Sequence, residues 1–226
     1  QLDGGEIRDE RALRELAGVV ETLGHAPTAY TDADLYRRGA ATLVASWEEY
    51  ARGAVDAAVQ RLPGAAAAVF PHEPERSVYN NALLDHRAPA LERSRSLEAI
   101  EAAYAAAGVD GFAVWAHEDD TALRHALERN GYRVATTTRA MGMALDGARL
   151  PLPELELAPP DWHEHLRVAQ LPPDFLADAD PAAFSVAVAR LGGESAATAL
   201  AFDLDGDCGI YNVGTLEHAR RRGLAT

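Results

Sequence analysis

The chain of 226 residues is short of several things that would define a protein class. It has one cysteine, Cys208, and no lysine, so all 21 of its basic residues are arginine. A single cysteine excludes an internal disulfide and a cysteine zinc cluster, and it fits a reducing compartment. No apolar run approaches the roughly 20 residues of a membrane helix, and no signal-peptide pattern opens the chain. These absences predict a cytoplasmic protein with no membrane partner.

Positive charge is also scarce. The 21 basic residues face 35 acidic ones, which gives a formal net charge of −14. Surfaces that bind phosphate backbones or anionic lipids carry an excess of positive charge, so nucleic acid is not an expected partner. Hydrophobic residues at 48% and charged residues at 25% are typical of a folded globular chain, and the length suits one large or two small domains.

The first two thirds of the chain indicate an α/β fold. Apolar periodicity predicts helices over 6–23, about 31–62, 97–107 and 120–129. A short apolar run covers 65–70, and apolar or alternating runs predict strands over 77–84, 111–117 and 132–145. Because strands and helices alternate over 77–145, we expect at least some parallel strand pairing.

Two proline-flanked turns between residues 146 and 160 indicate a domain boundary near 147–152. We therefore expect an N-terminal α/β domain over 1–147 and a second domain over 151–226. In the second domain the patterns predict a strand over 154–157, short helices over 162–170 and 181–188, and strands over 194–204 and 208–215. Asp205-Gly206 joins the last two strands and is a strong signal for a tight hairpin.

The segment Arg220-Arg-Arg-Gly-Leu-Ala225 fits the pattern Arg-x-x-Gly-x-Gly/Ala. Small residues at the fourth and sixth positions let backbone N–H groups approach a phosphate without obstruction by a Cβ atom. Matches also begin at Arg61 and Arg139, but the first contains the helix stop Pro63-Gly64 and the second lies inside a predicted strand. Only the match at Arg220 follows a hairpin-paired strand and could open a helix.

The strand Ile210–Thr215, the connection Leu216–Ala219 and the loop Arg220–Ala225 together resemble the GNAT acetyltransferase superfamily, most closely over 195–226. The resemblance implies an acyl-CoA N-acyltransferase fold with a mixed sheet, in a bacterial protein of two tandem domains. It implies transfer of an acetyl group from acetyl-CoA to an amine, and it leaves a homodimer open. The implied coenzyme A contacts are the main chain of the strand and the amides of the loop: Val213, Gly214, Thr215, Arg220, Arg221, Arg222, Gly223, Leu224, Ala225 and Thr226.

Residues 77–145 have the strand and helix order of the later half of such a domain. Between Leu84 and Leu97, however, the phosphate-loop pattern is missing, which predicts a degenerate first copy that does not bind coenzyme A. The second copy is then incomplete in this sequence, because its phosphate-binding helix would have only a few residues. We accordingly expect the natural chain to continue beyond Thr226.

The catalytic residues are not identified by the sequence. The base that accepts the amine proton could be Glu217 or a side chain reached through water. No metal is expected: His163 and His165 are two apart on a predicted helix, where they point apart, and we interpret them as part of a solvated face. Two alternatives to an N-acetyltransferase stay open, a non-catalytic coenzyme A or acyl-CoA binding or regulatory module, and an interaction module whose arginine loop binds nothing.

Overall fold

A computed structural model describes residues 30–73, 79–85, 87–138, 140–145, 155–173 and 180–224. The helix predicted over 6–23 lies outside the described residues. The chain divides into two compact units, Gln1–Tyr36 with Ala140–Glu154, and Arg37–Arg139 with Leu155–Thr226. In the first unit the described residues include the start of the helix α2 (Asp32–Gly53), where the side chain of Leu35 lies against Gly142. The boundary predicted near 147–152 stays a prediction.

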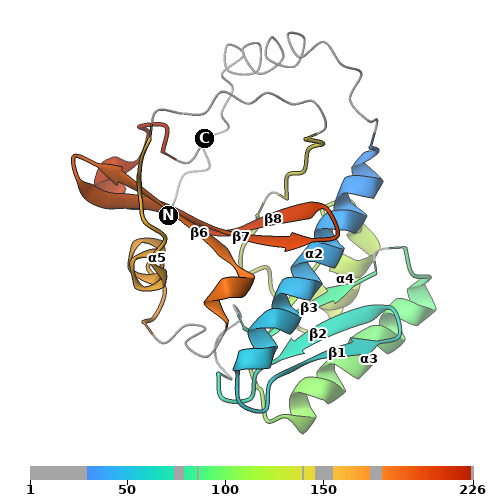
Figure 1. The fold of residues 1–226 in the computed structure, drawn as a ribbon. Helices are drawn as coiled ribbons and strands as arrows, with labels where there is room; N and C mark the ends of the chain where they lie inside the picture. The colour runs from blue at the N-terminus through green and yellow to red at the C-terminus, as the bar shows by residue number, and fades with distance from the viewer. Residues whose placement is uncertain are drawn as a thin grey trace. The chain divides into compact units, whose positions relative to one another are not determined.

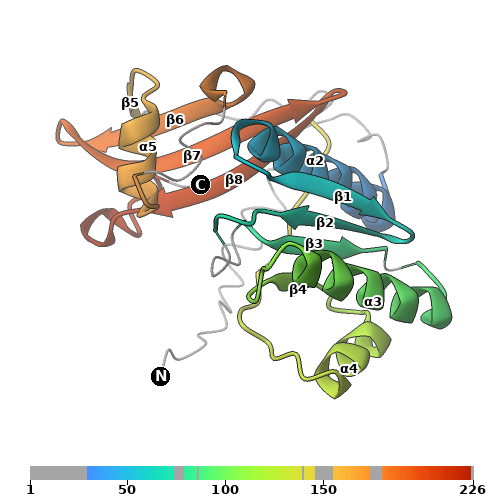
Figure 2. The same cartoon turned by 90° about the horizontal axis from the view of Figure 1, so that it is seen from below.

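The first sheet of the second unit is mixed and has the order β1-β2-β3-β4. Figure 1 labels β1, β2 and β3, and Figure 2 labels all four strands. β1 (Ala58–Leu62), β2 (Ala65–Val69) and β3 (Asn81–Leu84) pair antiparallel, and β3 pairs parallel with β4 (Ala113–Trp115). The helix α3 (Ala90–Ala106) connects the two parallel strands, and α4 (Thr121–Arg129) follows β4. The parallel pair confirms the pairing that the alternating sequence pattern predicts.

The second sheet is antiparallel throughout and has the order β5-β6-β7-β8. Its strands are β5 (Glu156–Ala158), β6 (Ser185–Leu191), β7 (Glu194–Leu204) and β8 (Asp207–Thr215). The helix α5 (Trp162–Ala169) packs across β6, β7 and β8, as Figure 2 shows. Two 3-10 turns complete the elements, η1 (Pro181–Ala183) and η2 (Glu217–Ala219). No helix in the described part of the chain is long and apolar enough to span a bilayer.

Two buried clusters hold the second unit together. In one, β2 and β3 pack against α3 and α4 around Ile100 and Tyr104, and the Tyr104 hydroxyl donates to the Ala68 carbonyl at 3.0 Å. In the other, Trp47 of α2 and Phe70 share a core with Leu200 and neighbouring aromatic residues. Because buried side chains of both sheets join this second cluster, burial of apolar surface stabilises the two sheets together.

The helix predicted over 31–62 is wrong in its last part. α2 ends at Gly53, and 58–62 form β1, which pairs with β2 from Ala58 opposite Val69 to Leu62 opposite Ala65. Pro63-Gly64 is therefore a two-residue hairpin turn, with Gly64 at a φ of +69°. This dipeptide breaks a helix and also turns a hairpin, so the sequence signal alone does not distinguish the two.

The helix predicted over 181–188 is also wrong. Only Pro181–Ala183 form a 3-10 turn, and β6 begins at Ser185. Gly192 and Gly193, with φ values of +62° and +85°, form the two-residue turn that joins β6 to β7. Since glycine takes positive φ without steric cost, this pair marks a hairpin and not the end of a helix.

The strand predicted over 132–145 is absent from its described residues, 132–138 and 140–145, which have no regular secondary structure. Val134, Met141 and Leu145 in this run are exposed. An alternating sequence becomes a strand only when another strand pairs with it, and no described strand does so here. The other predicted elements of the described chain are present with shifted ends: α3 begins earlier, and β3 and β4 are shorter than predicted.

Candidate functional site

β8 forms one edge of the second sheet. The Leu216 N–H donates to the Ala196 carbonyl at 2.9 Å, directly after the strand. In an antiparallel pair, successive residues point their N–H and C=O groups alternately toward the partner strand and away from it. Thr215 and Val213, one and three residues earlier, therefore present their main-chain groups to the outer edge. An extended ligand with amide groups could pair with them there.

The edge strand contains a β-bulge at Asn212 and Val213. Leu200 pairs with Tyr211 and Thr198 with Gly214, so the single residue Ala199 stands opposite both Asn212 and Val213. Asn212 adopts a φ of +49°, in the left-handed region, which asparagine enters more readily than most residues. Bulges redirect an edge strand and are frequent beside active sites. Asn212 is not among the site residues predicted from the sequence, although an asparagine within a strand is a weak signal for such a position.

Gly214 has a packing role that the loop motif does not suggest. A Cβ atom at Gly214 would lie 2.8 Å from the Ala169 Cα atom and 3.1 Å from the Val168 carbonyl oxygen. The last turn of α5 consequently lies directly on β8, and only glycine permits this approach. The contact fixes the position of the strand immediately after the bulge.

The loop after β8 is exposed and turns sharply. Ala219 is fully buried and anchors η2, after which Arg220, Arg221 and Arg222 project into solvent. Arg221 and Gly223 both have positive φ, at +61° and +74°. Left-handed residues in a loop can direct neighbouring N–H groups toward one concavity that suits an anion. Of the ten predicted contacts, the structure places Val213–Thr215 and Arg220–Leu224 in one continuous stretch, and Ala225 and Thr226 lie outside the described residues.

One contact within this stretch bears directly on ligand binding. The Arg220 Nε donates to the Thr215 carbonyl oxygen at 3.2 Å. This carbonyl is one of the groups that the edge offers to a ligand. Arg220 thus covers part of the edge in this structure, and a ligand that pairs with Thr215 must displace its guanidinium group.

The two histidines of α5 differ from the prediction of a shared solvated face. His163 is exposed, but His165 is fully buried, and its Nδ1 lies 2.8 Å from the Thr198 Oγ1. The prediction was wrong for His165 because Leu166 and Val168 turn that side of α5 toward the sheet, and His165 follows them inward. Among the described residues, no group of three or more His, Cys, Asp and Glu side chains could hold a metal ion.

Cys208 lies on β8 with its side chain exposed. Partial burial and a hydrogen bond with the Asp203 carboxylate raise the pKa of its thiol. A thiol is a good nucleophile only as the thiolate, so this environment disfavours a covalent role for Cys208. Tyr211, two residues before Val213, has its pKa raised to about 12 chiefly by burial, and its phenol stays protonated at neutral pH.

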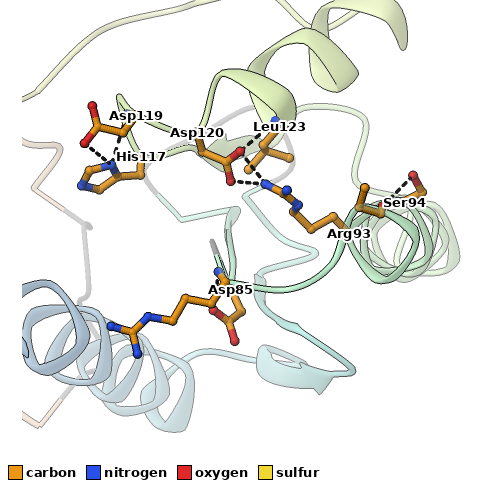
Figure 3. Close-up of polar contacts among 9 residues, drawn as sticks. Asp85, Arg93, Ser94, His117, Asp119, Asp120 and Leu123 are labelled. Atoms are coloured by element: carbon orange, nitrogen blue, oxygen red, sulfur yellow. Dashed lines mark hydrogen bonds and ion pairs between the residues drawn. The ribbon is translucent and has the colours of Figure 1, made fainter. Parts of the chain in front are cut away.

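The loop between β3 and α3 carries one carboxylate, Asp85, while the carboxylate of Asp120 reaches the first turns of α3 from the N-terminus of α4 (Figure 3). Asp85 follows β3 and accepts the Arg87 backbone N–H at 2.9 Å. Arg93 forms an ion pair with Asp120, whose side chain is 8% exposed and also caps α4 through the Leu123 N–H at 3.0 Å. Arg93 is therefore committed to a structural pair, and the adjoining turn carries one acidic and one basic residue, Asp85 and Arg87.

No family model and no curated protein matches the sequence. Among solved structures, the chain is similar to a GCN5-related N-acetyltransferase from Kribbella flavida, with a TM-score of 0.51 and 17% identity over 84% of this chain and 76% of that one. It is also similar to a functionally unknown conserved protein from Staphylococcus epidermidis ATCC 12228, with a TM-score of 0.48 and 10% identity over 75% of each chain.

At 17% identity, the first likeness concerns the fold alone. The chain has a mixed α/β architecture with two sheets, and this architecture is similar to that of a GCN5-related N-acetyltransferase. The mixed α/β fold expected from the sequence is thereby confirmed. The tandem copies and the incomplete second copy stay predictions.

Proposed function

We propose that this protein binds acetyl-CoA along the outer edge of β8 and in the loop from Arg220 to Thr226, and transfers the acetyl group to an amine. One observation carries the proposal: a bulged edge strand leads within five residues into an exposed, triple-arginine turn with two left-handed residues. The fold likeness to an N-acetyltransferase supports it.

The described residues fit the two parts of coenzyme A. Pantetheine is an extended chain with two amides, which suits the alternating main-chain groups of Val213 and Thr215. The pyrophosphate is an anion, which suits the backbone amides of the turn and the charge of the arginines. Arg220 would exchange its bond to the Thr215 carbonyl for a contact with phosphate.

Acetyl-CoA supplies a thioester, whose carbonyl carbon is open to attack by a neutral amine. Val213 is the second residue of the bulge, and its outward N–H would donate to the thioester oxygen as negative charge develops there. A base must accept the amine proton, and an acid must protonate the departing thiolate. Glu217 is exposed at the start of the loop and is one candidate base, whereas the acid stays unassigned.

A non-catalytic coenzyme A or acyl-CoA module is the second candidate. It is favoured by the first sheet, where the turn after β3 holds Asp85 and Arg87 instead of a phosphate loop, and Arg93 of α3 is paired with Asp120 at the start of α4. On the proposed function, this half does not bind coenzyme A, because the turn lacks the phosphate-loop pattern and the Arg93 guanidinium is already bonded to a carboxylate. A chain in which one half has lost the ligand site could also use the other half for sensing alone.

Titration with coenzyme A and acetyl-CoA, followed by thermal melting, tests the proposal first. A ligand that binds only the folded state must raise the melting midpoint. We expect both ligands to raise it for the wild type, and a smaller rise for the Arg221→Glu, Arg222→Glu variant. Arg95→Glu, Arg124→Glu, on exposed helix surfaces, is the control for the change in net charge. If neither ligand raises the melting midpoint of the wild type, the transferase and the coenzyme A module are both excluded, and only the interaction module is left.

Release of free thiol from acetyl-CoA in the presence of an amine panel then separates the two remaining functions. Amine-dependent thiol release above the hydrolysis rate supports the transferase. Binding without any amine-dependent release supports the non-catalytic module.

A further inference from the structure

We infer that His165 is a positioning residue for the bulged edge strand: its neutral imidazole, through Thr198, holds the main chain at Val213 in place for the ligand. The inference rests on the proposed function for its consequence, although not for its structural part. His165 is fully buried, lies on α5 and touches no candidate ligand group, so it acts through the strand and not on the reacting atoms.

The hydrogen bonds around Thr198 define the protonation of this histidine. The Thr198 Oγ1 donates its only proton to the Ala187 carbonyl oxygen at 2.9 Å. The same oxygen lies 2.8 Å from the His165 Nδ1 and must therefore accept from it. The Nδ1 carries the proton, and the chain His165 to Thr198 to Ala187 ties α5 to β7 and β6.

This chain reaches the candidate site through one pairing. Thr198 stands opposite Gly214 in the β7–β8 register, directly beside the place where Ala199 faces the bulge. Gly214 in turn lies against Ala169, one turn after His165 on the same helix. His165 and Ala169, one turn apart on α5, therefore contact Thr198 of β7 and Gly214 of β8, which stand opposite each other. A shift of α5 at either contact would change the direction of the Val213 N–H.

The Nε2 of His165 indicates why a histidine occupies this position. The His165 Nε2 is buried, and no hydrogen-bond partner for it lies among the described residues. A buried acceptor without a partner costs free energy, which an apolar side chain of similar size would avoid. The Nδ1–H donor is what His165 supplies and an apolar residue cannot. An asparagine amide can take the place of the Nδ1–H, whereas a glutamine amide reaches the place of Nε2 instead.

A charge on this imidazole would act against the arrangement. The charged side chains on the elements around it are Glu164 and Arg167 of α5, Arg190 of β6, Glu194 and Asp203 of β7, and Asp207 of β8. The other titratable groups on these elements are His163, Cys208 and Tyr211. Glu164 and Arg167 pair with each other at 2.9 Å. None of these groups hydrogen-bonds the Nε2, so a second proton there would be buried without an acceptor.

Nitrogen NMR of the histidine side chains tests the structural part without any ligand. At pH 7.5 we expect His165 to be the neutral tautomer with the proton on Nδ1. The neutral tautomer with the proton on Nε2, or a charged ring, would overturn the inference.

Paired variants test the positioning. His165→Asn and Thr198→Ser keep the donor and the hydroxyl, and His165→Gln and Thr198→Val remove them. From the usual contribution of one hydrogen bond, we expect Kd for coenzyme A to rise about tenfold for the second pair and less than about twofold for the first. The backbone amide signals of Val213 and Thr215 should move with the second pair alone.

The outcomes separate this inference from the proposed function. If coenzyme A does not bind the wild type, the proposed function fails, and the amide signals still decide the inference. If it binds and the two pairs behave alike in both readouts, His165 is a packing residue only, and the inference is wrong. Should His165→Gln fail to fold, the Thr198→Val and Thr198→Ser pair gives the same comparison.

Discussion

Thr198 of β7 stands opposite Gly214 of β8, and each contacts α5, Thr198 through the imidazole of His165 and Gly214 through the backbone of Ala169. The helix α5 therefore contacts both members of one cross-strand pair, one on β7 and one on the edge strand β8. Gly214 lies beside Val213 in the strand proposed to bind coenzyme A. We therefore expect substitutions in α5 to change the main-chain position of Val213 and the affinity for coenzyme A.

Gly214→Ala should destabilise the protein and weaken coenzyme A binding. The added methyl group would stand 2.8 Å from the Ala169 Cα atom, and backbone cannot move aside as a flexible side chain can. The expected loss in the free energy of unfolding is about 1–3 kcal/mol, as for other overpacked sites. Urea unfolding measures it. Gly39→Ala is the matched control, because a methyl group there meets nothing within 4 Å and α2 should gain roughly 0.5–1 kcal/mol.

Asn212→Gly and Asn212→Val should separate the bulge conformation from the side chain. The φ of +49° is open to glycine, but it strains a β-branched residue by roughly 1–3 kcal/mol. We expect the glycine variant to keep the wild-type affinity for coenzyme A and the valine variant to lose stability and affinity together. Calorimetric titration and urea unfolding provide both numbers. Equal affinity of the two variants would show that the bulge does not shape the site.

Arg221→Ala, Arg222→Ala should weaken coenzyme A binding by about tenfold and flatten its dependence on salt. Exposed guanidinium groups attract phosphate through charge that dissolved ions screen. Titrations at two or more salt concentrations give the slope. The variant Arg95→Ala, Arg124→Ala removes the same charge from α3 and α4, and its affinity and slope should match those of the wild type. An unchanged slope for the loop variant would remove the arginines from the site.

Stability should fall as the pH is lowered below about 6.5. Burial lowers the pKa of His165 in the folded protein from its ordinary value of 6.5. Between that lowered pKa and 6.5 the unfolded chain binds more protons than the folded one, so acidification favours unfolding, by at most about 1.4 kcal/mol per pH unit for one histidine. Above pH 6.5 the imidazole is neutral in both the folded and the unfolded chain, so the free energy of unfolding keeps its full value with respect to this group.

His165→Asn should remove this part of the pH dependence while it keeps the bond to Thr198. Urea unfolding between pH 5 and pH 8 compares the two proteins. His163→Asn is the matched control, since its imidazole is exposed on the same helix. A slope that persists unchanged in His165→Asn would assign the pH dependence to other groups.

The sequence was most informative where local chemistry fixes the backbone. Asp205-Gly206 predicted the β7–β8 hairpin, and both residues have the positive φ values, +50° and +83°, that such a turn requires. Asp120 and Asp161 cap α4 and α5 through the Leu123 and Glu164 N–H groups. In these places, residues a few positions apart determine the structure by themselves.

The predictions were wrong where the local structure depends on residues far away in the sequence. The alternating run over 132–145 forms no strand in its described residues, because nothing in the local pattern specifies a pairing partner. The burial of His165 depends on β7 supplying Thr198, 33 residues away. The bulge at Asn212 arises from the register of two strands, which a single strand's sequence does not contain. The arginine loop could be located by its motif, but the support beneath it could not.

The bulge at Asn212 also bears on solubility. A regular strand from another molecule that paired with β8 would lose its hydrogen-bond register at Asn212, because the backbone there turns to a positive φ. Natural proteins use such interruptions to keep exposed edges from extending into shared sheets. On the proposed function, an edge interrupted in this way would still offer the main chain of Val213 and Thr215 to a short ligand. The same irregularity can thus admit a small partner and keep the protein from polymerising through its open edge.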